Sequence, residues 1–444
     1  MRIVRGLEQS REALLTNRGL GLDSAPASVL ERTESAFGKA MTPIQTAEYI
    51  VTRVREGGDE AVRDITRRLD GIEVAELEVS KSTIQDAYDS VAAEVVEALQ
   101  LSAERIRRFQ QKSLPESWVD FDEGYGELVN AVGRAGIYVP GGTARFPSTV
   151  LMSAIPAKVA GVREVVITTN PGIDQGVHPV VLVAADIAGV DRVFQIGGAQ
   201  AIAALAYGTE TVPKVDMVCG PGGLFTTLAK KLVYGEVGLD GLYGPTETLV
   251  LADDSGNPTL CAADLLAQAE HDILAKPVLI TTSERLAERV NSEISVRLGT
   301  LDRMEIAARS VKEQGIIAVV ADLEEGFELA NAFAPEHVSL MLRDPWSHVG
   351  RVKNAGAVFL GDFSHEVLGD YVAGPSHVMP TGGTARFGSG LNVRSFLKFS
   401  PIVGLSDKRA SQLSKAASLL GRVEGLTAHA EAAEIRDEMG GEET

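Results

Sequence analysis

DRVFQIGGAQAIAALAY, residues 191–207, decides the fold class of this chain. A short apolar strand runs into a Gly-Gly turn, and an apolar helix follows at once. The same scheme recurs in residues 214–233, where KVDMVCGPGG leads into FTTLAKKLV, and two further strands precede it in RAGIYVPGG and EVVITTNPG. Strands that alternate with helices form parallel sheets, because a parallel partner needs a crossover connection. The sequence therefore predicts an α/β fold.

A second set of strands follows this region. TETLVLAD, KPVLITTS, IIAVVAD and AGAVFLGD are apolar runs of strand length, and helices separate the first two pairs. We therefore expect two Rossmann-like parallel-sheet domains, the second inserted in the first, with helical N- and C-terminal extensions. The expected division is an N-terminal arm at 1–35, a first domain at 36–137 and 246–390, a second domain at 138–245, and a C-terminal helical tail at 391–444.

Composition excludes several classes of protein. The 444 residues carry a net charge of −19 with no basic stripe, which argues against a nucleic-acid partner. No run of 18 apolar residues predicts a membrane span, and the N-terminus lacks the apolar segment of a signal peptide. The two cysteines, Cys219 and Cys261, fit no disulfide or metal pattern, so we expect buried reduced thiols in a cytoplasmic protein.

Two pairs of polar residues are candidates for chemistry. Gln268 and His271 lie three apart on a predicted helix, which places both on one face where they could bind a metal. The spacing alone is a weak signal, since a single helical histidine is more often structural. Glu336 and His337 follow Pro335 on a predicted loop or turn start, where they would either transfer protons or form an ordinary surface loop.

A long glycine- and proline-rich stretch lies at residues 369–393 and contains Asp370 and His377. Long loops in compact enzymes are usually functional, so both side chains are candidates for a site. Glu424 and His429 add two more in the tail. No Gly-x-Gly-x-x-Gly fingerprint follows a strand, although the glycine turns lie where phosphates often bind. The residues by themselves predict an α/β enzyme with a candidate metal site.

The same stretches resemble the histidinol dehydrogenase family, from about residue 36 to 430. Six segments resemble its motifs in order: GIYVPGGTARFPSTVLMSAIPAKVAGV, QIGGAQAIAALAYGTETVPKVD, GPTETLVLAD, DLLAQAEHD, FAPEHV and GDYVAGPSHVMPTGGTARFGSGL. The resemblance implies a cytoplasmic, zinc-dependent oxidoreductase of histidine biosynthesis. Such an enzyme oxidises L-histidinol to L-histidine through histidinal and uses two NAD.

The resemblance also assigns roles to individual residues. It implies one zinc per subunit and a catalytic pair, Glu336 and His337, in which His337 takes the hydroxyl proton and Glu336 activates water. The implied zinc ligands are Gln268, His271, Asp370 and His429. The implied substrate-binding residues are Thr246, Gln268, His271, His337, Asp370, His377, Glu424 and His429. The first domain would thus hold the metal, and the second domain would bind NAD.

The NAD contacts implied by the resemblance are at Tyr138, Gln200 and Gly223. The family usually has asparagine where this chain has Gly223, so one side-chain contact to NAD is missing and binding could be weaker. Thr246 occupies the place of a serine, which keeps the hydroxyl and adds a methyl group.

Members of the family are homodimers whose tails cross to the partner, so the resemblance implies active sites shared between subunits. One alternative is a relative that oxidises another alcohol, such as a sulfonated diol. His377 and Glu424 argue against it, because a sulfonate calls for arginine or lysine. A second alternative is a non-catalytic metal-binding or assembly protein, which would keep the ligands and lose Glu336 and His337.

Overall fold

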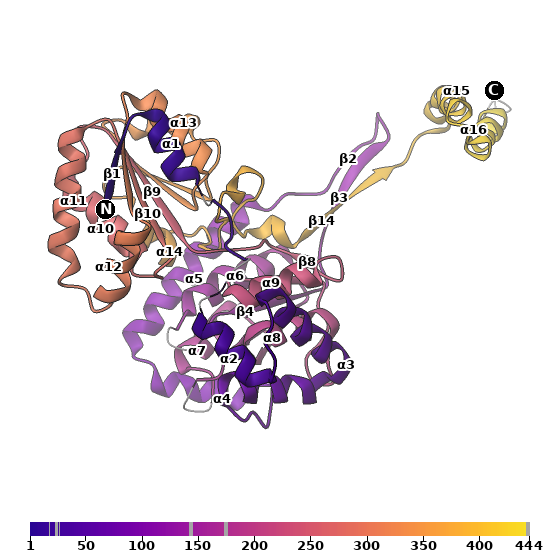
Figure 1. Ribbon diagram of the computed structural model, residues 1–444. Helices are drawn as coiled ribbons and strands as arrows, with labels where there is room; N and C mark the ends of the chain where they lie inside the picture. The colour runs from indigo at the N-terminus through magenta and orange to yellow at the C-terminus, as the bar shows by residue number, and fades with distance from the viewer. Residues whose placement is uncertain (17, 23–24, 26, 142–144, 173–175, 441–444) are drawn as a thin grey trace. The chain divides into compact units, whose positions relative to one another are not determined.

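The structure is a computed structural model that describes residues 1–16, 18–22, 25, 27–141, 145–172 and 176–440 (Figure 1). The chain divides into two compact units. The first unit comprises Met1–Ser113 and Val132–Phe396, and the second comprises Leu114–Ala131 and the residues from Leu397 onward.

A six-stranded parallel sheet forms one half of the first unit. Its order is β1-β11-β10-β9-β12-β13. The strands are β1 (Arg2–Arg5), β9 (Glu247–Ala252), β10 (Lys276–Thr281), β11 (Ile316–Val319), β12 (His337–Met341) and β13 (Ala357–Leu360).

Helices cover both faces of this sheet, because successive strand residues point to opposite faces. Val250 and Leu279 pack against one group of helices, and Leu249 and Val278 pack against the other group (Figure 1). The first group is α10 (Pro258–Ala269), α11 (Glu284–Leu298) and α12 (Met304–Glu313), and the second is α1 (Leu7–Leu15) and α13 (Leu323–Phe333).

A five-stranded parallel sheet forms the other half of the first unit, in the order β6-β5-β4-β7-β8. Its strands are β4 (Arg134–Val139), β5 (Glu164–Thr169), β6 (Arg192–Phe194), β7 (Met217–Cys219) and β8 (Gly238–Leu239). Its crossover helices are α6 (Pro147–Ala160), α7 (Pro179–Ala188), α8 (Gly198–Tyr207) and α9 (Leu224–Val233). The predicted α/β fold with two parallel sheets is confirmed. The glycine turn after β4 includes Gly142, which lies outside the described residues.

The helices before β4 pack with the five-stranded sheet. They are α2 (Ala27–Phe37), α3 (Pro43–Asp70), α4 (Lys81–Asp86), the 3₁₀ turn η1 (Ala87–Ser90) and α5 (Ala93–Ser113). Thr42 caps α3 in a capping box with Gln45, and Pro43 occupies the first position. α3 packs on α8 and α9, and α5 packs on α6. This packing differs from the expected grouping of 36–137 with the other sheet, since an amphipathic pattern does not identify which sheet a helix covers.

The first residues of the chain belong to the six-stranded sheet. β1 pairs with β11, and α1 packs on α13. An N-terminal arm was expected because residues 1–35 are polar and end in a stretch rich in Gly, Ser and Pro. An edge strand of this kind forms through backbone pairing with its neighbour, which its own sequence does not encode.

The second unit contains a three-stranded antiparallel sheet and a helical hairpin. The strands, in the order β14-β3-β2, are β2 (Trp118–Asp120), β3 (Tyr125–Ala131) and β14 (Leu397–Val403), and the helices are α15 (Asp407–Val423) and α16 (Thr427–Gly440). The two helices agree with the predicted tail. β14 was not expected, because Lys398 and Pro401 interrupt its apolar residues; Pro401 is tolerated on an edge strand.

Two of the remaining short elements lie between β12 and β13, and the other three follow β13. They are η2 (Pro345–Ser347), η3 (Val349–Arg351), α14 (Glu366–Tyr371), η4 (Thr384–Arg386) and η5 (Val393–Phe396). Both cysteines are buried free thiols, as expected. Within the described parts of the chain, we find no helix with the length and apolar character needed to cross a membrane.

Candidate active site

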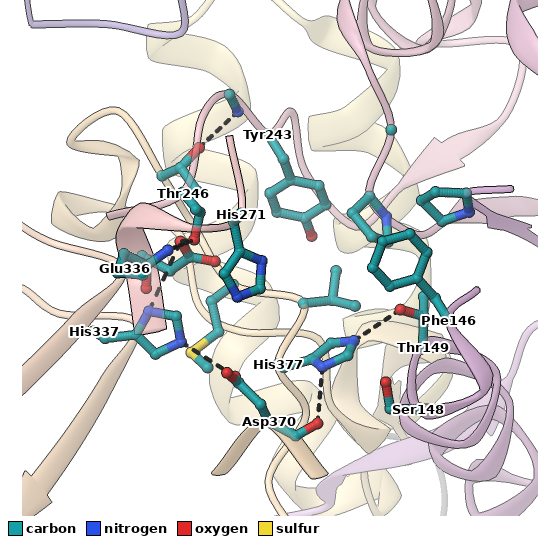
Figure 2. Close-up of a pocket in the computed structure, with 18 of the residues that line it drawn as sticks. Phe146, Ser148, Thr149, Tyr243, Thr246, His271, Glu336, His337, Asp370 and His377 are labelled. Atoms are coloured by element: carbon teal, nitrogen blue, oxygen red, sulfur yellow. Dashed lines mark hydrogen bonds and ion pairs between the residues drawn. The ribbon is translucent and has the colours of Figure 1, made fainter. Parts of the chain in front are cut away.

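A pocket of about 270 Å³ lies in the first unit where the two sheets face each other (Figure 2). Pro140 and Pro221 follow β4 and β7, so the five-stranded sheet contributes its carboxyl edge. Thr246 and Glu336 precede β9 and β12, so the six-stranded sheet contributes its amino edge. Both strand pairs lie where the strand order of their sheet reverses, which is the usual position of a ligand crevice on the carboxyl side.

Gln268 and His271 both line this pocket, but they do not share a helix. α10 ends at Ala269, and the His271 N–H donates to the Gln268 carbonyl at 3.2 Å in a tightened last turn. The Gln268 amide is buried and fixed at both ends. Its Oε1 accepts from the Thr248 hydroxyl at 2.7 Å, and its Nε2 donates to Thr246.

Glu336 and His337 come from a buried turn, so the surface-loop interpretation is wrong. Only 7% of Glu336 and 3% of His337 is exposed. α13 ends at Ala334, whose φ of 51° makes it the one non-glycine residue with positive φ in the described part of the chain. Pro335 then prevents the helix from continuing, and His337 opens β12.

The hydrogen bond of His337 selects one tautomer of its neutral ring. Nδ1 lies 3.1 Å from the Glu247 carbonyl oxygen and donates to it. Nε2 lies 3.6 Å from Asp370 Oδ1 and is a buried atom without a hydrogen-bond partner among the described residues. In the neutral ring, Nε2 therefore carries a lone pair directed at the pocket, which is what a proton acceptor needs.

Glu336 is held by the segment that opens β9. Its Oε2 accepts from the Thr246 hydroxyl and from the Glu247 N–H at 3.0 Å. The hydroxyl that Thr246 shares with serine thus donates to a pocket carboxylate. Burial raises the pKa of Glu336 to about 7, although His337 and these donors oppose the shift.

Buried carboxyl groups outnumber cations in the pocket and next to it. Glu366 does not line the pocket but contacts Thr248, which donates to Gln268. Burial also raises the pKa of Glu366, to about 8. Burial lowers the pKa of His337, but Glu336, Asp370 and Glu366 outweigh it and raise that pKa overall. Burial raises the pKa of Asp370, but His337 and two further histidines outweigh it and lower that pKa below the ordinary value. Burial lowers the pKa of His271, which keeps its ring neutral.

His377 lies on the pocket wall and holds Asp370 in place (Figure 2). Its Nδ1 donates to the Asp370 carbonyl at 3.0 Å, and its Nε2 lies 2.9 Å from the Thr149 hydroxyl. Burial lowers the pKa of His377, so Nε2 accepts from Thr149. Both ring nitrogens are used, and the predicted substrate contact of His377 stays a prediction.

Tyr138 and Gln200 lie beneath a glycine turn. The Gly198 N–H donates to the Tyr138 hydroxyl at 3.3 Å, and that hydroxyl lies 3.2 Å from Asn170 Oδ1. Gln200 donates weakly to Thr66, while its Oε1 is buried without a partner in the described region. Their predicted NAD contacts stay predictions.

The turn after β7 is fixed by a buried ion pair. Lys230 Nζ lies 2.6 Å from Asp240 Oδ1 and donates to the Gly220 carbonyl at 3.0 Å. Asp240 Oδ2 accepts from the Gly220 N–H at 2.7 Å. This turn therefore presents a fixed set of backbone groups to the pocket at the start of α9.

Gly223 caps α9 in an extended conformation. Its φ is −72°, and a Cβ atom would meet nothing within 4 Å. Neither the backbone conformation nor the space around it therefore requires glycine at this position. At Gly222, in contrast, a Cβ atom would lie 2.4 Å from the Thr226 side chain.

Glu424 and His429 belong to the second unit. Glu424 ends α15, Gly425 turns the chain with a φ of +75°, and His429 lies in the first turn of α16. Both side chains are exposed.

The donors in the first unit fit a divalent cation. Among the residues described, no three His, Cys, Asp or Glu side chains form a metal cluster. His271, Asp370 and the amide of Gln268 nevertheless line one pocket. A metal ligand must be a neutral imidazole or an ionised carboxylate, and the lowered pKa values of His271 and Asp370 favour these forms. The surplus of buried carboxyl groups is a second feature that a cation would balance.

The sequence did not identify three residues of this site. Thr149 orients His377, Glu366 contacts Thr248, and Tyr243 lines the pocket with a buried hydroxyl that has no partner among the described residues. Glu366 lies four residues before Asp370 on α14, and Tyr243 directly precedes the 244–253 motif. Their closeness to these motifs in the sequence was the signal that could have identified Glu366 and Tyr243.

Comparison with known proteins identifies the family. A sequence model of the family described as histidinol dehydrogenase matches residues 33–437. The histidinol dehydrogenase of Deinococcus radiodurans is 49% identical over 440 residues, which cover 98% of this chain and all of that protein. That of Thermus thermophilus is 50% identical over 389 residues and covers 87% of this chain and 93% of its own length.

A solved structure agrees with these matches. The crystal structure of histidinol dehydrogenase from Elizabethkingia anophelis superimposes with a TM-score of 0.88 at 30% identity, covering 99% of this chain and 98% of that one. The chain therefore belongs to the histidinol dehydrogenase family.

Proposed function

We propose that this chain oxidises L-histidinol to L-histidine through histidinal and reduces two NAD in each cycle. We propose that the reaction takes place in the cytoplasm. The observation that carries the proposal is the buried Nε2 atom of His337, which lines the pocket beside Asp370 and has no hydrogen-bond partner among the described residues. The family match supports the choice of substrate. The excess of carboxyl groups suits a substrate that carries an ammonium group.

His337 Nε2 takes the proton of the substrate hydroxyl while hydride leaves the carbinol carbon. The aldehyde stays in the pocket, where Glu336 removes a proton from water and the hydrate forms. A second hydride and proton loss then gives the carboxylate. Glu336 must be ionised for its step, and the Thr246 hydroxyl and Glu247 N–H favour that form.

Gln268, His271 and Asp370 would hold a zinc ion together with His429 of the partner subunit. When bound, zinc would supply a Lewis acid that orients the substrate's nitrogen and oxygen atoms. The charge of the zinc ion would also offset the carboxylate charge that raises the pKa of His337. A lower pKa would favour the neutral ring, which a general base needs in order to accept a proton.

The five-stranded sheet would bind NAD, which supplies the hydride acceptor. The open space above Gly223 and the backbone N–H groups at the start of α9 support a phosphate position there. Tyr138 and Gln200 would support that surface from below.

A panel of alcohols tests the proposed substrate. L-Histidinol should give about two NADH per molecule consumed, and chelation should stop NADH formation until zinc is restored. No lysine or arginine lines the pocket among the described residues, so a sulfonated diol should not react. Turnover of the diol in place of histidinol, or full activity without metal, would overturn the proposal.

We further propose a homodimer in which the tail of each subunit completes the site of its partner. Several apolar side chains of the helical hairpin are exposed, which supports a partner surface there. They are Leu413, Leu419, Leu420, Val423, Leu426 and Ile435.

Subunit mixing tests the shared site. His337→Asn and His429→Asn homodimers should each be nearly inactive. In a hybrid, the His429→Asn body receives an intact tail, so one of its two sites is whole. Random exchange makes about half the dimers hybrid, and activity should recover to about a quarter of wild type. No recovery after verified exchange would exclude crossed tails.

A further inference from the structure

The segment around Arg18 lies against the loops that build the pocket. A Cβ atom on Gly244 would lie 2.9 Å from the Leu20 carbonyl oxygen, and one on Gly382 would lie 3.0 Å from Gly19. Gly244 lines the pocket, and Gly382 has a φ of +64°. Two glycines thus permit close backbone approach of this segment to the site.

The Arg18 side chain is only 8% exposed and forms a two-pronged ion pair with Glu247. One terminal nitrogen lies 2.7 Å from Glu247 Oε2, and the other contacts Oε1. The Glu247 side chain is 1% exposed, and Arg18 is the one residue in the described chain that forms an ion pair with it. Planar pairing of this kind fixes geometry as well as charge.

Arg18 also holds the end of α13. It donates to the Phe333 carbonyl at 2.6 and 3.0 Å and to the Ala334 carbonyl at 3.3 Å, and its guanidinium lies 3.7 Å from the centre of the Phe333 ring. A cation is favourable at the carbonyl end of a helix. A positive φ is unfavourable for alanine, so this turn depends on neighbouring contacts.

Both segments that Arg18 joins lead directly to the catalytic pair. Pro335, Glu336 and His337 follow the two carbonyls it holds. Glu247, its partner, donates its N–H to Glu336 and accepts from His337 Nδ1. The guanidinium therefore links the turn before the pair to the strand that orients the pair.

We infer that Arg18 is a positioning residue for Glu336 and His337. It contacts no reacting atom and lies outside the 33–437 family match, yet it belongs to the catalytic structure. The inference rests on the proposed roles of that pair. Without Arg18, Glu247 would be a buried carboxylate with no ion-pair partner, and its main chain could no longer hold both catalytic side chains in place.

The test compares Arg18→Ala, Arg18→Lys and Arg11→Ala. Arg11 is the matched control, because it pairs with Glu328 on the same helix α13 but its side chain is 34% exposed. We expect Arg18→Ala to lower kcat for histidinol by about 10- to 100-fold, as a misplaced catalytic group does, with the KM for NAD changed less than about twofold. Amide hydrogen exchange at residues 333–341 should accelerate in this variant and not in the control. Arg18→Lys should show a smaller loss of kcat, since it keeps the charge without the fork.

The outcomes separate the inference from the proposed function. An inactive wild type, or a fully active His337→Asn variant, refutes the proposed function and the inference with it. A fully active Arg18→Ala beside an inactive His337→Asn refutes the inference alone, as does an equal loss in Arg11→Ala. If Arg18→Ala does not fold, Arg18→Lys decides in the same way by its kcat.

Discussion

Apart from the edge strand β1, the two parallel sheets of the first unit have the same strand order, and they present opposite edges to the pocket. β4 and β7 end at it, whereas β9 and β12 begin at it. The carboxyl edge supplies backbone, in the turn at Gly220–Gly223 and the start of α9. The amino edge supplies the Glu336 and His337 side chains, with Thr246 beside them.

This difference has a physical cause. At the carboxyl edge of a parallel sheet, helix N-termini gather and present free N–H groups, which suit phosphates. At the amino edge, helices arrive with their C-termini, and titratable side chains must be built there from turns such as 333–337. The carboxyl edge therefore suits the binding of a cofactor, and the amino edge suits proton transfer. The variants below act on one edge and should spare the other.

The largest effect should come from His337 on the amino edge. His337→Asn removes the acceptor Nε2, so kcat should fall by about 10²- to 10⁴-fold with NAD affinity unchanged. His365→Asn is the matched control, because His365 does not line the pocket. Steady-state kinetics and NAD titration measure both. Similar activity in the two variants would contradict the role of His337.

Glu336→Gln should impair mainly the oxidation of histidinal. Because burial raises the pKa of Glu336 to about 7, its ionised fraction falls below that pH. Wild-type aldehyde oxidation should therefore slow as pH decreases through about 7, and the variant should lack this limb. Separate assays with histidinol and histidinal measure the two halves. Equal slowing of both would show that the assigned division of roles is wrong.

The carboxyl edge is tested by Gly223→Asn. The extended backbone and open space allow the side chain, so one added hydrogen bond should tighten NAD binding by up to about tenfold. Gly222→Asn, where Thr226 blocks the Cβ, should weaken it. Fluorescence titration with NAD distinguishes them. Unchanged affinity in Gly223→Asn would mean that the cofactor does not reach this turn.

The smallest effect concerns stability and again belongs to the amino edge. Glu336 and Glu366 have folded-state pKa values of about 7 and about 8, above the ordinary 4.5. The folded chain thus binds more protons than the unfolded chain, and this stabilisation is lost as pH rises through those values. The Tm of metal-free protein should decrease from about pH 5 to about pH 8, and Glu366→Gln should reduce the slope. A rising Tm in the wild type would contradict the burial of these carboxyl groups.

The sequence predicted eight of the eleven strands of the two sheets, because their apolar runs and the glycine turns beside them are local signals; β1, β8 and β12 were not predicted. The cap of α3 is a local signal of the same kind, since Thr42 and Pro43 lie next to each other in the sequence. The strand β1 and the packing of α3 depend on partners distant in sequence, and neither was predicted. Gln268, His271, Asp370, Glu336 and His337 do line one pocket. The role of Arg18 could not be predicted from the sequence, because it depends on contacts with Glu247 and Phe333, which are distant in sequence.

Diffraction from a crystal with zinc, NAD and histidinol, measured at the zinc absorption edge, tests the two-edge account most directly. The account predicts a zinc peak at about 2.0–2.2 Å from donor atoms of Gln268, His271 and Asp370. It also predicts the pyrophosphate of NAD at the Gly220–Gly223 turn and the substrate hydroxyl within hydrogen-bond distance of His337 Nε2. A zinc peak away from these donors, or NAD bound at the six-stranded sheet, would contradict it.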